Sequence, residues 1–404
     1  MTKLADKTII YVTRDLERAL GPQTIVAAYF IITNSTPFAK ELSSRQKNIL
    51  LINSPELLDT HELLVHPETS NYLEKLIDPQ ILVFKNTSTI EQICADKGWG
   101  LLNPAAQLAN KIEEKISQVE WLDDLTKFLP PHKIILLKEV KFDHTPFIIQ
   151  FNRAHTGNGT ILIDSEKVLI DLQQKFPDRP VRVTTFVKGT MFTSNNVVFS
   201  DQIIVGNRNV QITGLAPFTD QPFATIGNDW SLGTNRLTSA QFAQYQEMVI
   251  ALGEKLRASG WRGLFGTDFI LADTGELYLI EINARQPAGT TFESQLQSQL
   301  KTGLTTFSLH LLSLLGEPLT EKTLAPVESG AQIILRNQTT IFSESCLTVF
   351  SERLKTAGFT VIRYQNTEPG SDLIRIQSNA GIMNTPNTFN KIGESIVQAL
   401  HCSI

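Results

Sequence analysis

Short apolar runs alternate with helix-length segments along the first hundred residues. The runs rich in β-branched residues are 8–13, 25–32, 49–53 and 81–84. This alternation is typical of a layer in which strands and helices follow one another as βαβ units. The glycine-rich fingerprint of dinucleotide-binding domains is missing after the first run, where Thr13, Arg14 and Asp15 stand instead. The pattern therefore predicts an N-terminal Rossmann-like domain over residues 1–105 that is not an NAD domain.

The middle and the end of the chain mix both periodicities. Apolar spacing over 106–122 predicts a helix that ends before Pro130 and Pro131. Farther on, a helix is predicted over 239–259, among strand-like runs with the sequences PFIIQF, VRVTTFV, NVVFS and FILAD. From about residue 326, the strand-like runs GAQIILR and TVIRY flank an amphipathic segment. We therefore predict an α/β protein with a mixed middle unit and a small C-terminal α/β unit.

Composition narrows the classes of protein. The 404 residues suit two or three domains, and 42% hydrophobic with 19% charged residues suits packed cores. A net charge of -5 gives no field for gathering nucleic acid. Apolar stretches are too short for a bilayer and the start lacks a signal-peptide pattern, while three scattered cysteines indicate neither a disulfide framework nor a zinc site. We expect a cytoplasmic enzyme acting on small molecules, with no nucleic-acid or membrane partner.

The segment 263–285 carries the strongest chemical signal. Two strands around the turn 272–275 predict a hairpin that brings Asp268 beside Glu281 and Asn283. Two carboxylates and an amide oxygen suit Mg²⁺ or Mn²⁺ when a nucleotide supplies the other ligands. Arg285 shares that face, where a guanidinium suits a phosphoryl group or a carboxylate. A surface hairpin with scattered charge would explain any one of these residues, but the four together favour a metal-nucleotide site.

The GxxGxDF opening and the EINAR close of this segment resemble the metal-binding hairpin of the ATP-grasp superfamily. The separation 281 − 268 = 13 also matches the spacing found there. The resemblance implies three parts: a pre-ATP-grasp domain over 1–105, an α+β ATP-grasp domain over 106–318 that binds ATP and Mg²⁺ or Mn²⁺, and a C-terminal α/β unit over 319–404. The metal ligands would be Asp268, Glu281 and Asn283.

The same resemblance implies a set of nucleotide contacts. A phosphate-contacting lysine on the helix entering the grasp domain corresponds to Lys111, with Lys115 one turn later as the alternative. Glycines let backbone N–H groups approach phosphate oxygens closely. The small-residue loop over the triphosphate would comprise Gly157, Gly159 and Thr160. The backbone beside the adenine would be that of Thr185, Phe186 and Val187.

The chain departs from the family pattern at two places. Gln150 stands where many members have a second lysine; it can hydrogen-bond the nucleotide but brings no charge, and Arg153 could compensate. Thr184 and Thr185 stand where the family often has glutamate. Adenine contacts would then rest mainly on the backbone.

Two histidines invite a functional interpretation. His155, next to the glycine loop, has a side chain suited to acid–base chemistry near neutral pH, but such loop histidines are commonly only polar surface. His310 lies in an apolar segment, 309–315, and is expected to be a packed core residue.

The resemblance implies a ligase reaction. A substrate carboxylate would attack the γ-phosphate of ATP, giving ADP and an acyl phosphate, and an amine or similar nucleophile would then expel phosphate. Arg285 would stabilise the tetrahedral intermediate. Two alternatives stay open: a biotin-carboxylase-like carboxylase, suggested by EINAR, and a nucleotide-binding regulatory protein that lost turnover. The C-terminal unit, with Arg336, Arg353 and Arg363, could be a lid, a substrate wall or a homodimer contact. The segment 206–233, rich in Asn, Thr, Gly and Pro, is expected to be a substrate-side loop, with Arg208 as a candidate anion contact.

Overall fold

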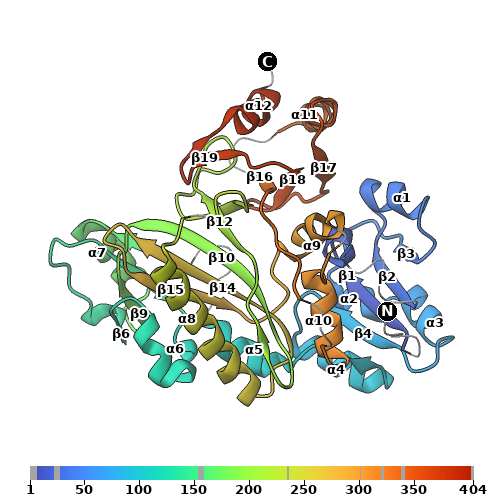
Figure 1. Cartoon of the computed structure of the whole chain (residues 1–404), viewed down its shortest axis with the longest axis horizontal. Helices are drawn as coiled ribbons and strands as arrows, with labels where there is room; N and C mark the ends of the chain where they lie inside the picture. The colour runs from blue at the N-terminus through green and yellow to red at the C-terminus, as the bar shows by residue number, and fades with distance from the viewer. Residues whose placement is uncertain are drawn as a thin grey trace.

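The computed structural model describes residues 7–21, 28–152, 159–233, 236–300, 302–319, 323–337 and 342–401. Within these residues the chain builds a five-stranded parallel sheet, a four-stranded sheet, a nine-stranded sheet and a short two-stranded ribbon. Figure 1 shows the parallel sheet with its helices at one side, the two larger antiparallel layers at the other, and the C-terminal unit above them. This arrangement confirms the α/β fold class.

The N-terminal sheet follows the predicted apolar runs. Its strands are β1 (Ile9–Thr13), β2 (Tyr29–Asn34), β3 (Ile49–Ile52), β4 (Gln80–Val83) and β5 (Gly100–Leu101). The 3-10 helix η1 (Leu16–Ala19) and four helices surround them: α1 (Pro37–Ser43), α2 (Thr60–Val65), α3 (Pro67–Leu73) and α4 (Ser88–Lys97). The order β3-β2-β1-β4-β5 reverses between β1 and β4. In open parallel sheets, ligands bind beside such a reversal, at the carboxyl ends of the strands.

The helix predicted over 106–122 is broken into two. α5 (Ala106–Glu113) and α6 (Ser117–Leu122) are followed by the 3-10 helix η2 (Asp123–Phe128). The break occurs because Asn152 binds the chain there: its backbone oxygen accepts from the Lys115 N–H at 3.2 Å, and its side-chain oxygen accepts from the Ile116 N–H at 2.9 Å. The prediction of one continuous helix was therefore wrong at Glu114–Ile116.

Two antiparallel layers form the middle of the molecule. The four-stranded sheet has the order β6-β9-β7-β8 and contains β6 (His132–Leu136), β7 (Phe147–Phe151), β8 (Thr160–Ile163) and β9 (Pro180–Thr185). Beside it lie the 3-10 helix η3 (Leu137–Glu139) and α7 (Glu166–Lys175). The nine-stranded sheet begins with β10 (Gly189–Val198), β11 (Ile203–Ile204), β12 (Arg208–Thr213), β13 (Thr225–Asp229), β14 (Gly263–Ala272) and β15 (Leu277–Asn283). Helix α8 (Ser239–Ala258) packs on it through buried residues such as Tyr245 and Met248.

The C-terminal strands extend this same nine-stranded sheet. β16 (Ala331–Arg336) pairs with β13, and β18 (Asp372–Ser378) and β17 (Thr360–Arg363) follow. The unit also contains α11 (Glu344–Thr356), β19 (Met383–Thr385), β20 (Thr388–Phe389) and α12 (Lys391–Ala399). Cys346 is disulfide-bonded, which the cysteine spacing did not indicate.

Two helices join the N-terminal sheet to the large sheet. α9 (Thr290–Gln299) and α10 (Thr306–Leu314) follow the predicted metal hairpin. Phe307 and Leu311 of α10 belong to the same core cluster as Ile9 and Tyr11 of β1. The division at residues 105 and 318 stays a prediction, because α10 packs into the N-terminal core. In the described part of the chain, no helix combines the length and apolarity needed to cross a bilayer.

Candidate active site

A cavity of about 750 Å³ opens between the four-stranded and the nine-stranded sheets. Its walls come from all three parts of the chain, including Arg18 and Phe84 beside the reversal point of the parallel sheet. One end is bounded by β7, β9, β10 and β14, and the other by β13, β16 and β18. The cavity is therefore large enough for a nucleotide with a second substrate next to it.

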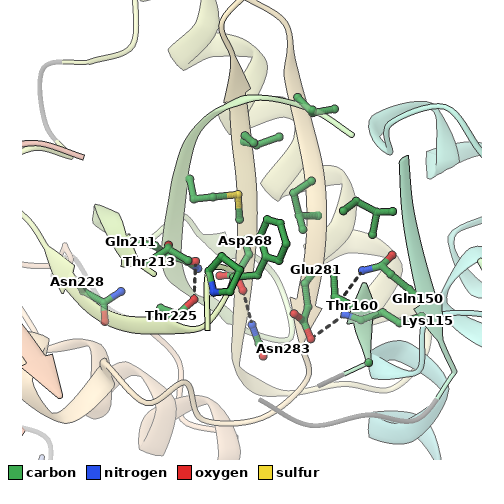
Figure 2. A pocket seen from close by; sticks show the side chains of 18 of the residues that line it. Lys115, Gln150, Thr160, Gln211, Thr213, Thr225, Asn228, Asp268, Glu281 and Asn283 are labelled. Carbon is green, nitrogen blue, oxygen red and sulfur yellow. Dashed lines mark hydrogen bonds and ion pairs between the residues drawn. The ribbon is translucent and has the colours of Figure 1, made fainter. Parts of the chain in front are cut away.

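The predicted hairpin places its polar residues in the middle of this cavity. Asp268 on β14 pairs with Glu281 on β15, and Gly266 pairs with Asn283. The Asn283 amide donates to the Asp268 carboxylate at 3.2 Å, and both side chains point toward the cavity in Figure 2. The three residues expected to hold the metal thus converge as the register predicted, while their role stays a prediction.

The two carboxylates of the hairpin have different environments. Burial and the neighbouring Glu281 raise the pKa of Asp268 to about 6, although hydrogen bonds from Thr193 and Asn283 oppose the shift. Burial alone would raise the pKa of Glu281, but Lys115, followed by two arginines, lowers it overall. A divalent cation would relieve the repulsion between the two carboxylates.

The donor set fits a hard cation only in combination with other oxygen ligands. No cluster of three or more His, Cys, Asp or Glu side chains suitable for a metal occurs in the described ranges. Asp268 and Glu281 supply carboxylates and Asn283 an amide oxygen, so phosphate oxygens or water would have to complete the shell. This is the arrangement expected where the metal arrives with a nucleotide.

Lys115, and not Lys111, reaches the hairpin. The Lys115 ammonium lies 2.9 Å from the Glu281 carboxylate and lines the cavity. Lys111 points away on the exposed face of α5 and is not part of the cavity lining. The break in the helix after Glu113 turns the chain so that Lys115 faces inward. The expectation for Lys111 therefore does not agree with the geometry, which favours the alternative lysine.

The loop expected over the triphosphate is described in part. Gly159 and Thr160 line the cavity, whereas Gly157, together with Arg153 and His155, lies outside the described residues. Gln150 also lines the cavity, and its amide nitrogen lies 3.5 Å from the Thr160 hydroxyl.

The end of β9 forms one wall of the cavity. Thr185, Phe186 and Val187 all line the cavity, together with the apolar side chains Ile148, Met191, Ile270 and Ile280. Thr184 lines it too, and its buried hydroxyl has no hydrogen-bond partner among the described residues. Because buried polar groups are normally paired, an unpaired hydroxyl in an apolar slot fits a ligand with polar edges, such as a purine base.

Arg285 leaves the hairpin and turns to α5. Its guanidinium forms an ion pair with Glu113, whose other carboxylate oxygen accepts from Lys85 at 2.6 Å. Arg285 still lines the cavity next to Asn283. Its position therefore allows contact with a substrate while Glu113 fixes its orientation.

The opposite end of the cavity was largely missed by the sequence analysis. Segment 206–233, expected to be a loop, forms β12 and β13, and Arg208 packs over the Phe242 ring at 4.2 Å outside the cavity. A hydrogen-bonded row crosses these strands: Gln332 donates to Asn228 at 3.2 Å, and Arg375 donates to Gln332 at 3.2 Å. Charged residues lining this end are Arg18, Arg336, Asp372 and Arg375.

The structure places His310 in the core and separates the three C-terminal arginines from one another. His310 is a packed core residue, as predicted, with 3% of its surface exposed. Of the three C-terminal arginines, Arg336 lines the cavity. Arg353 instead bonds the His401 carbonyl, and Arg363 bonds Glu344 on the surface.

Comparison with known proteins gives one sequence relative and many structural ones. No family model matches the chain. The [butirosin acyl-carrier protein]--L-glutamate ligase of Niallia circulans is 29% identical over 142 residues, which are 34% of this chain and 32% of the relative. The matched part of the chain thus spans about a third of that relative's length.

Solved structures match nearly the whole chain. N5-carboxyaminoimidazole synthase from Aspergillus clavatus, in complex with ADP and 5-aminoimidazole ribonucleotide, aligns with a TM-score of 0.64, 13% identity and 98% of both chains covered. The Staphylococcus aureus N5-carboxyaminoimidazole synthetase complexed with ADP aligns with a TM-score of 0.65 and 13% identity, covering 99% of this chain and 98% of that one. L-amino acid ligase from Bacillus licheniformis aligns with a TM-score of 0.64 and 14% identity, covering 98% of this chain and 97% of that one.

These likenesses establish the fold, which is that of the ATP-grasp ligases. The fold that the resemblance drawn from the sequence implies is thereby confirmed.

Proposed function

We propose that this protein is an ATP-dependent ligase that activates a substrate carboxylate as an acyl phosphate and joins it to an amine, releasing ADP and phosphate. The observation that carries the proposal is the convergence of Asp268, Glu281 and Asn283 with Lys115 inside one cavity. Metal ligands and a phosphate-binding cation are what phosphoryl transfer requires of a protein, because positioning and charge stabilisation supply most of the acceleration.

Different residues along the cavity would bind the adenine, the metal ion and the phosphates. The wall at Thr185, Phe186 and Val187 would hold the adenine. Asp268, Glu281 and Asn283 would hold Mg²⁺ or Mn²⁺ against the phosphates, and Gly159 and Thr160 would cover them. When bound, metal-ATP supplies the phosphoryl group that activates the carboxylate.

The end of the cavity beyond the hairpin suits the two organic substrates. Arg285 is oriented by Glu113 and lies next to the hairpin, where it would stabilise the oxyanion of the tetrahedral intermediate. Arg336 and Arg375 would bind a carboxylate or another anionic group of a substrate. The row formed by Asn228 and Gln332 offers neutral hydrogen-bonding partners to the polar remainder. Small polar acids and amines therefore fit this end best.

The substrates of the relatives indicate where to begin. The Niallia circulans relative is named for an acyl-carrier protein and L-glutamate, and the Bacillus licheniformis structure for L-amino acids. We therefore propose amino acids as the first compounds to test, both as carboxylate donors and as amine acceptors. A carboxylase and a non-catalytic regulator are the alternatives. ADP release that depends on both an amine and an organic carboxylate, and that bicarbonate does not support in place of the carboxylate, separates a ligase from both.

Magnesium-dependent ATP binding tests the central assignment. Calorimetry would compare the wild-type chain with the double variant Glu281→Ala/Asn283→Ala, with and without Mg²⁺. We expect the wild type to bind ATP only with magnesium and the variant to lose at least about tenfold in affinity, because two of its three ligands are gone. The matched control is Asp273→Ala/Glu276→Ala, which changes two exposed residues at the turn of the same hairpin.

The calorimetry results distinguish a correct assignment of the metal-nucleotide site from an incorrect one. Binding lost in the first variant and kept in the control supports the site and justifies a screen for ADP release with pairs of amino acids. Binding that persists in the first variant, or a wild type that ignores ATP, contradicts the proposal.

A further inference from the structure

A nearly buried guanidinium faces the cavity from β9. Arg182 is 3% exposed, lines the cavity, and lies directly opposite Gln150 in the register of β7 and β9. Its Nε and Nη2 both donate to the Gln150 side-chain oxygen, at 2.8 and 2.5 Å. Its Nη1 donates to the Gln118 side-chain oxygen at 3.2 Å.

This charge lacks a carboxylate partner. Among the described ion pairs none involves Arg182, whose hydrogen-bond acceptors are two neutral amide oxygens. Burial lowers the pKa of Arg182 to about 10, although the charge of Glu281 opposes this. A guanidinium taken out of water is costly unless an opposite charge accompanies it. An anion entering the cavity would provide that charge.

The geometry also explains the glutamine at position 150. The ATP-grasp pattern leads to the expectation of a lysine there, and Gln150 supplies no charge. Its oxygen instead holds the guanidinium of the adjacent strand, so the positive charge is displaced by one strand. Gln118, anchored by its own bond to the Ile112 carbonyl at 2.8 Å, fixes the guanidinium from the other side.

The two glutamines leave part of the guanidinium unused. A guanidinium has five N–H donors in a fixed fork, and three are engaged here, which leaves 5 − 3 = 2 without a described partner. Planar forked donors suit phosphate oxygens better than a point charge does. Lys115 borders the same cavity and pairs with Glu281, so both cations lie near this carboxylate of the hairpin.

We propose that Arg182 is a polyphosphate-binding residue of this cavity and replaces the charge that Gln150 lacks, with Gln150 and Gln118 holding it in place. The proposal rests on the proposed nucleotide-dependent function, because it assigns the phosphates of that nucleotide a partner on β9.

The test measures affinities for ATP, ADP, adenosine and inorganic tripolyphosphate by calorimetry on the full chain. In Arg182→Gln we expect at least a tenfold loss for ATP and tripolyphosphate, and less than about a twofold change for adenosine, because a charged hydrogen bond is removed only from the phosphates. The double variant Gln150→Lys/Arg182→Gln returns the charge to β7 and should recover most of the loss. Lys133→Gln, an exposed charge on neighbouring β6, is the matched control and should change nothing.

A second variant covers the case in which Arg182→Gln fails to fold. Gln150→Glu supplies Arg182 with a carboxylate while keeping the size of the side chain. It should raise the thermal midpoint and weaken tripolyphosphate binding at least tenfold, because the buried charge is then neutralised from within.

The other possible results distinguish the failure of the Arg182 proposal from the failure of the proposed nucleotide-dependent function. Unchanged affinities for the phosphates in a folded Arg182→Gln, or an equal loss for adenosine, would overturn the role of Arg182. A wild type that binds tripolyphosphate but not ATP would overturn the nucleotide-dependent function, and the variants would still decide on Arg182. A wild type that binds neither overturns both.

Discussion

Two lysines four residues apart in the sequence have opposite surroundings, and this difference is testable. Lys115 contacts Glu281 in the cavity, whereas Lys111 is exposed on α5. We predict that Lys115→Ala weakens Mg²⁺-ATP binding at least tenfold, because a cation next to the phosphates is lost. Lys111→Ala, the matched control, should stay within about twofold of the wild type when both are measured by calorimetry.

The reverse order of effects would contradict the geometry. A large loss in Lys111→Ala with no loss in Lys115→Ala would mean that α5 presents a different face to the nucleotide. If neither variant loses affinity for Mg²⁺-ATP, neither lysine contacts the phosphates. The Arg182→Gln measurement then tests whether Arg182 is the cation that does.

The sequence could predict some of these residues and not others for a physical reason. Asp268, Glu281 and Asn283 converge through one tight hairpin, where alternation and a short turn fix the neighbours. Lys115 faces inward only because Asn152, far along the chain, binds its backbone N–H. Arg182 acquires its role from a cross-strand partner. Such non-local contacts leave no local pattern.

At the scale of elements, β14 and α10 pack through a buried histidine. His310 Nδ1 accepts a hydrogen bond from the Leu264 N–H at 3.0 Å. A Cβ at Gly263, whose φ is +84°, would lie 2.5 Å from that same nitrogen. Only glycine therefore permits this approach at the start of β14, which carries Asp268 a few residues on.

The buried histidine predicts an acid-sensitive stability. Burial lowers the pKa of His310 to about 3, below its ordinary value of 6.5. Above pH 6.5 the imidazole is neutral in both the folded and the unfolded chain and contributes no pH dependence. As the pH falls below 6.5 the unfolded chain gains a proton that the folded chain excludes, so the free energy of unfolding falls. This loss would reach about 2 kcal/mol at pH 5.

Urea unfolding from pH 7.5 to 4.5 measures this effect against His310→Asn. The asparagine keeps an acceptor for the Leu264 N–H but cannot titrate, and other groups cancel in the difference between the two proteins. We expect the wild type to lose stability more steeply below pH 6.5 than the variant. Parallel curves would show that His310 becomes protonated in the folded chain.

Among the helices and strands, those with a strong local hydrophobic periodicity are the ones that the sequence predicts well. The strands of the parallel sheet and the helix α8, expected over 239–259 and found over Ser239–Ala258, follow from strong local periodicity. The composition of segment 206–233, rich in Asn, Thr, Gly and Pro, predicts a loop, yet β12 and β13 pair within the large sheet. Tertiary pairing overrides composition there.

At the scale of the whole molecule, the three parts of the chain close around one cavity. The large sheet runs without interruption from the predicted metal hairpin to the C-terminal strands, and α10 packs its apolar face into the N-terminal core. Tyr11 of the N-terminal sheet donates to Gln286, just after the hairpin, at 2.8 Å. Movements of the N-terminal or C-terminal part would therefore displace residues that line the cavity.

A buried tyrosine connects the first and last parts of the chain most directly. Tyr364 donates its hydroxyl hydrogen to the Glu17 carboxylate of η1 and accepts from Arg375 Nε at 2.8 Å. All three side chains are at most 7% exposed. Tyr364→Phe removes the bond between the two charged groups while preserving shape, so we predict a loss of about 1–3 kcal/mol in the free energy of unfolding.

Urea denaturation measures that loss, and Tyr72→Phe serves as the control because its hydroxyl bonds no other described residue. A double-mutant cycle with Glu17→Gln measures the coupling between the two residues, since the effects of substitutions within one hydrogen-bond network are not additive. An interaction energy of at least about 0.5 kcal/mol would mean that Tyr364 and Glu17 hold the two parts together. Additive effects would instead mean that each residue stabilises only its own part of the chain. The apolar contacts of α10, and not this hydrogen bond, would then hold the parts together around the cavity.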